Sequence, residues 1–116
     1  MKTDFEQWLG AQFADTGPFT IFIVLVRIAG QRVSSVKSTY AQMIGAEMKW
    51  TEMCALLESA ETPWDAVSFF VGLGEKGPLA DPVARTKLNG IEASVTTDPL
   101  ELNRGMFFDR LGRHLR

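Results

Sequence analysis

The stretch "FTIFIVLVRIAG", residues 19–30, is the most apolar part of the chain, and its character decides the fold class. The apolar run ends at Arg27, so it is shorter than the roughly 20 apolar residues that a helix needs to cross a membrane. It is rich in isoleucine, valine and phenylalanine, which favour a strand over a helix. Both of its alternating sets of side chains are apolar. We therefore predict a strand that is covered on both faces.

The residues that follow predict the second arm of a β-hairpin. In "RIAGQ", the glycine stands where a type I turn closes with a left-handed residue. The next segment, "RVSSVKSTY", is dense in serine, threonine and valine, which suit strands better than helices. We predict paired strands at 19–28 and 31–40.

One long helix over 35–60 is the alternative for this region. Large side chains recur there at spacings of three and four residues, as on one face of a helix. Gly45 and the density of serine and threonine weigh against it, and we favour the hairpin.

The rest of the chain predicts three helices, one further strand and a second hairpin. The helices follow from apolar residues at helical spacing, with Thr3 or Asp4, Thr51 and Asp81 as expected N-caps. The strand, like the opening stretch, is apolar in both alternating sets. The predicted helices are 4–14, 51–60 and 82–96, and the predicted strands are 65–73, 105–109 and 112–116.

The helix at 82–96 also has an alternative. Asn89-Gly90 is a common two-residue hairpin turn, so the segment 83–97 admits a hairpin. We favour the helix because Pro82 follows Asp81, and proline is common at the first helical position.

These elements predict one α+β domain over residues 1–116, with a mostly antiparallel sheet and the order α-β-β-α-β-α-β-β. Two strands with apolar residues on both faces need cover on both sides. We expect three helices to be too few for that, and therefore expect a second copy of the chain to cover part of the sheet, as in a homodimer.

Composition and charge exclude several classes of protein. The chain is 46% hydrophobic and 22% charged, as in a soluble globular domain. Its net charge of −2 does not favour a general polyanion binder. A single cysteine, Cys54, forms no intramolecular disulfide and no cysteine-cluster zinc site. The first ten residues contain acids and no apolar segment, so we expect no signal peptide and a cytoplasmic location.

No motif in the sequence is complete enough to assign catalysis, a cofactor or a metal. "GLGEKG", residues 72–77, matches the glycine pattern of dinucleotide sites, but Pro78 follows it and Asp81 would repel a phosphate at the next helix. Cys54 and His114 are single candidates without a local nucleophile motif. Scattered carboxylates leave a small enzyme as the least favoured interpretation.

Two features of the sequence are candidate binding elements. Residues 104–116 contain four arginines and one aspartate, and arginines beside phenylalanines are typical of nucleic-acid contacts. Tryptophans are frequent at protein interfaces, and two of them flank the middle helix. The candidate binding residues are Arg104, Arg110, Arg113, His114, Trp50 and Trp64.

From these features we expect a non-catalytic binding or assembly module that acts through protein contacts, with another protein or a second copy as partner. A nucleic-acid contact by the C-terminal hairpin is the alternative function.

Overall fold

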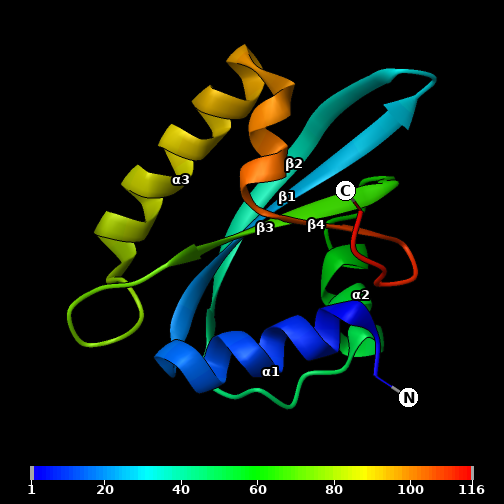
Figure 1. Cartoon of the computed structure of the whole chain (residues 1–116). Helices are drawn as coiled ribbons and strands as arrows, with labels where there is room; N and C mark the ends of the chain where they lie inside the picture. The colour runs from blue at the N-terminus through cyan, green and yellow to red at the C-terminus, as the bar shows by residue number, and fades with distance from the viewer. Residues whose placement is uncertain (1, 116) are drawn as a thin grey trace.

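A four-stranded antiparallel sheet forms the centre of the molecule (Figure 1). The computed structural model describes residues 2–115. The strands lie in the order β2-β1-β3-β4, so β2 and β4 are the edge strands. This arrangement confirms the predicted α+β class and element order. The strands are β1 (Phe19–Ala29), β2 (Arg32–Met43), β3 (Ala66–Gly72) and β4 (Met106–Asp109).

The central strand β1 is buried on both faces over Phe19–Val26. On one face, Phe19, Ile21, Ile23 and Leu25 join the main core. The helices α1 (Asp4–Thr16) and α2 (Trp50–Glu58) contribute their apolar side chains to that core. The predicted double burial of this strand is confirmed.

Two further helices cover the opposite face of the sheet, as Figure 1 shows. These are α3 (Asp81–Thr97) and the short 3₁₀ helix η1 (Pro99–Arg104). Val95 of α3 and Leu102 of η1 pack there with Val24 and Val26 of β1. The cover on this face includes η1, an element that the sequence did not predict. The burial of β1 therefore needs no second copy of the chain, and the homodimer stays a prediction.

The structure resolves both alternatives that the sequence leaves open. Residues 32–43 form a strand rather than the start of a long helix, and the hairpin turn contains Gly30 with a φ of +63°. The segment with Asn89-Gly90 lies inside α3 rather than in a hairpin turn.

The helix starts follow the sequence signals only in part. Thr3 caps α1 as predicted, because its side chain accepts a bond from the Glu6 N–H. Thr51 and Asp81 are not caps, since each already lies in the first turn of its helix. Lys49 and Ala80 occupy the cap positions instead. None of the helices within residues 2–115 is long and apolar enough to cross a membrane.

The C-terminal hairpin forms with a shorter return arm than predicted. Asp109 accepts bonds of 2.9 Å from the N–H groups of Leu111 and Arg113, and Gly112 has a φ of +77°. Instead of a strand at 112–116, the return arm makes one bridge, between Phe108 and His114. Two backbone bonds flank it, from the Asp109 N–H to the Arg113 carbonyl at 3.0 Å and from the Leu115 N–H to the Phe107 carbonyl at 2.7 Å. The last residue of that predicted strand, 116, lies outside the described residues.

Candidate functional site

Three of the predicted binding residues meet beside α2. The Trp50 Nε1–H donates to the Arg110 carbonyl at 2.9 Å, and the Arg110 guanidinium carbon lies 4.2 Å from the centre of the Trp64 ring. Arg110 also donates to the Trp64 carbonyl at 3.3 Å and pairs with Glu58 at 3.0 Å. Both tryptophans are buried. Their contacts therefore attach the C-terminal turn to the main core.

The other predicted residues lie elsewhere. Arg113 pairs with Asp109 at 2.7 Å in the turn, and the His114 N–H donates to Asp4 at the start of α1. Arg104 lies at the end of η1, on the α3 side of the sheet, and pairs with Glu101 at 2.8 Å. The six residues do not form one site.

These ion pairs bear on the nucleic-acid alternative. Arg104, Arg110 and Arg113 each have a carboxylate partner within 4 Å. A phosphate would have to compete with these carboxylates, which reduces the electrostatic gain on which such binding depends. The alternative stays a prediction, without support from the arrangement of its arginines.

Two titratable groups have pKa values that are shifted by their surroundings. Burial raises the pKa of the Cys54 thiol, which disfavours the reactive thiolate. Bonds from the N–H groups of Trp50 and Thr3 lower the pKa of Glu6, which serves there as a structural acceptor. Among residues 2–115, no group of three or more histidine, cysteine, aspartate or glutamate side chains is placed to hold a metal ion.

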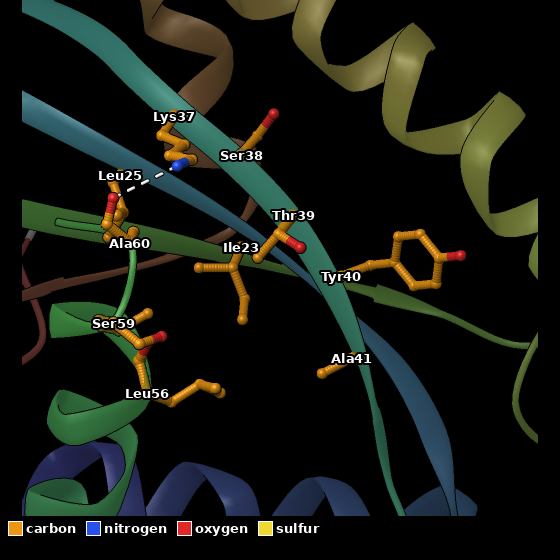
Figure 2. A pocket seen from close by; sticks show the side chains of 11 residues that line it. Ile23, Leu25, Lys37, Ser38, Thr39, Tyr40, Ala41, Leu56, Ser59 and Ala60 are labelled. Atoms are coloured by element: carbon orange, nitrogen blue, oxygen red, sulfur yellow. Dashed lines mark hydrogen bonds between the residues drawn. The ribbon is translucent and has the colours of Figure 1, made fainter. Parts of the chain in front are cut away.

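An apolar groove lies between β2 and α2. It has a volume of about 240 Å³, and Figure 2 shows Ile23, Thr39, Ala41 and Leu56 around it. Its wall is formed partly by Leu56, which is 43% exposed. The full lining is Ile23, Leu25, Lys37, Ser38, Thr39, Tyr40, Ala41, Leu56, Leu57, Ser59 and Ala60.

The groove runs beside the free edge of β2. This strand pairs with β1 only, and it has no partner strand on its other side in the described chain. Free edges of this length expose N–H and C=O groups that another strand can pair with. A bulge at Val36, where the register shifts between Leu25 and Val26, separates the hairpin tip from the segment beside the groove.

The direction of the β2 peptide groups follows from the ladder on the other side of β1. In an antiparallel pair, the N–H and C=O of a residue point to the same neighbour, and the direction alternates along the strand. The Val26 carbonyl accepts a bond of 2.8 Å from the Asp65 N–H, on the β3 side. The N–H and C=O groups of even-numbered β1 residues therefore point to β3. Those of odd-numbered residues, such as Ile23, point to β2.

This alternation assigns the outward-facing groups of β2. Lys37, Thr39 and Ala41 lie opposite odd-numbered residues of β1 and bond to them. The residues between them therefore direct their N–H and C=O groups to the free edge. These are Ser38, Tyr40 and Gln42.

The side chains of these three residues are fixed on the α3 side of the sheet. Ser38 bonds to Glu92, and Tyr40 Oη donates to Asp81 at 3.2 Å. Gln42 donates to the Leu79 carbonyl at 3.1 Å. The edge is thus held in an extended conformation, its outward backbone groups have no partner strand within residues 2–115, and the groove lies on its other face (Figure 2).

The sequence analysis did not find this edge or its groove. The available signal was the contrast between two neighbouring strands, since β1 is apolar except for Thr20 and Arg27 while "RVSSVKSTYAQM" has many small and polar residues. Such a strand has little apolar surface to bury, which is typical of a sheet edge.

Comparison of the chain with family models, with curated proteins and with solved structures returns no match.

Proposed function

We propose that this protein is a non-catalytic binding module that docks an extended segment of another protein against β2. The observation that carries the proposal is the pairing of a free strand edge with an apolar groove along the same residues. An added strand forms main-chain bonds with the edge, and its alternate side chains enter the groove. The main-chain bonds give affinity, and the side chains that enter the groove give specificity.

A second copy of the chain fits this site less well than a different protein. Two β2 strands can pair through the outward groups of Ser38, Tyr40 and Gln42. The groove would then receive the partner's Lys37, Thr39 and Ala41, which are charged or small. An apolar groove is filled favourably by large apolar side chains, which β2 lacks on this face.

A proline substitution at Ser38 tests the docking proposal. Proline has no N–H, and at this position the missing donor is one that faces solvent rather than β1. We expect Ser38→Pro to remain folded and to lose binding of peptides selected from a library of displayed random 12-residue peptides. Binding is measured by fluorescence polarisation, and folding by circular dichroism.

Two further variants act as controls. Ser35 lies beyond the bulge, opposite the even-numbered Val26, so its N–H also faces outward, and it is not part of the groove lining. Ser35→Pro should therefore weaken binding of the selected peptides much less than Ser38→Pro does. Ser38→Ala removes only the hydroxyl bond to Glu92. If Ser38→Pro binds as tightly as the parent, strand addition at this edge is wrong. If Ser38→Ala loses as much binding as Ser38→Pro, the side chain rather than the N–H is responsible.

A further inference from the structure

Lys37 is the charged residue in the lining of the groove, and no carboxylate within residues 2–115 pairs with it. Its Nζ instead donates to the Ala60 carbonyl at 3.3 Å, just after the end of α2 (Figure 2). The ammonium group is therefore held at one end of an otherwise uncharged groove, where it is exposed to an incoming ligand.

The net charge of the edge strand β2 is positive, like that of Lys37. Between Arg32 and Met43, β2 contains two cationic residues and no acidic one. Complementary charge steers association and rejects partners of like charge. Glu92 and Asp81 lie beside Ser38 and Tyr40, but on the α3 side of the sheet. On the groove side, where Lys37 is the charged lining residue, the site favours a segment that carries negative charge near Lys37.

From these observations we infer that the docked segment has large apolar side chains at alternate positions and an acidic side chain opposite Lys37. This inference rests on the proposed function and specifies the partner's chemistry at the same site. Side chains at alternate positions of a strand share a face, with neighbours roughly 7 Å apart. The groove-facing positions of Lys37, Thr39 and Ala41 therefore correspond to one acidic and two apolar positions of the ligand.

β2 continues past Lys37. This bears on whether the carboxylate opposite Lys37 belongs to a side chain of the docked segment or to its C-terminus. Five more residues of β2 lie beyond it, from Val36 to Arg32. A docked segment therefore has room to run past Lys37 instead of ending there. This geometry favours an internal acidic side chain over the terminal carboxylate of a partner.

Matched peptides test this inference. The probes are blocked nonapeptides with one alternating valine and threonine core, and with glutamate, glutamine or lysine at the next groove-facing position. Each is made in both sequence directions, so that parallel and antiparallel docking are both sampled. At low salt we expect the glutamate peptide to bind about fivefold more tightly than the lysine peptide, as for an exposed ion pair. The difference should shrink in 1 M salt, where the Debye length is about 3 Å.

Two substitutions of Lys37 test whether its charge causes the difference in affinity between the peptides. Lys37→Met keeps the apolar stem and removes the charge, so it should bind all three peptides alike. Lys37→Glu should reverse the order and prefer the lysine peptide. Amide exchange at Ser38, Tyr40 and Gln42 reports separately whether each peptide pairs with the edge.

The outcomes separate the two proposals. If the peptides protect these amides but bind equally, with no change in Lys37→Glu, the acidic requirement is wrong and strand docking stands. If no peptide protects the amides, strand docking itself is wrong, and the inference fails with it.

Discussion

At the scale of single residues, Gly112 connects the C-terminal turn to the main core. Its φ of +77° lies in the left-handed region, which glycine adopts without the steric cost that a side chain adds. A Cβ on this residue would lie 2.9 Å from two atoms of the Trp50 ring. The sequence analysis identified the turn glycine, but the contact with Trp50 joins residues far apart in the chain and has no local signal.

Gly112→Ala should therefore destabilise the fold by about 1–3 kcal/mol, through backbone strain and the clash with Trp50. Urea unfolding followed by tryptophan fluorescence measures the change. The matched control is Gly10→Ala in α1, where a Cβ meets no atom within 4 Å. That control should stabilise the helix by about 0.5–1 kcal/mol. Equal effects of the two substitutions would contradict the role given to Gly112.

Asp109 gives the same turn a dependence on pH. Burial raises the pKa of this carboxyl, but bonds from Arg113 and from the Leu111 N–H outweigh it and hold the pKa below its ordinary value. A carboxyl with a lower pKa in the folded state stabilises the protein above its unfolded pKa of about 4. This contribution is lost as the pH falls below about 4 and through the lower, folded pKa.

Asp109→Asn should remove this part of the acid sensitivity, because asparagine keeps an acceptor oxygen and has no charge to lose. We expect the variant to be less stable than the parent at pH 7, with the difference closing toward pH 2. Urea midpoints measured across that range give the comparison. A gap that stays constant with pH would show that the charge of Asp109 does not stabilise the turn.

At the scale of elements, prediction from sequence succeeds where composition alone decides the outcome. β1 is apolar in both alternating sets, and both of its faces are buried. The start of α3 was predicted from Asp81 and Pro82, and the helix continues through Asn89-Gly90 because Ala84 and Val95 bury their side chains beneath it. The return arm of the last hairpin was overestimated, since Asp109 and Gly112 specify a turn and do not fix how many residues pair after it.

The groove is a feature that could not be predicted from the sequence. Its lining comes from β1, β2 and α2, which are separate in the chain, so no window of sequence contains it. The position of η1 over the sheet was also unpredicted, and this position decides that β1 is covered within one chain. Tertiary placement, rather than local propensity, sets both features.

The free edge of β2 predicts an alternating pattern of amide exchange without any ligand. Amides of Lys37, Thr39 and Ala41 donate to β1 and should exchange slowly, because their bonds open only with the sheet. Amides of Ser38, Tyr40 and Gln42 face solvent and should exchange much faster. Hydrogen exchange followed by NMR resolves the two sets. If the even-numbered amides are as protected as the odd-numbered ones, the edge is not free.

At the scale of the whole molecule, two cores on opposite faces of one sheet determine how much surface remains for partners. The main core joins α1 and α2 to the sheet, and the second core joins α3 and η1. Because the two cores lie on opposite faces of the sheet, the backbone groups of the described strands that lack a partner strand lie at its edges. The β2 edge combines free backbone groups with an adjoining apolar groove.

We therefore expect the isolated protein to have the mass of one chain, 12.9 kDa, in light scattering at micromolar concentration. Pairing of two β2 strands is the competing arrangement. It would form backbone bonds but would fill each groove with the partner's Lys37, Thr39 and Ala41, which bury little apolar surface. A mass about twice that of the chain, with amides of Ser38 and Tyr40 protected more strongly as concentration rises, would show that β2 pairs with itself. In that case the natural partner of this edge is a second copy, and docking of a different protein at β2 is wrong.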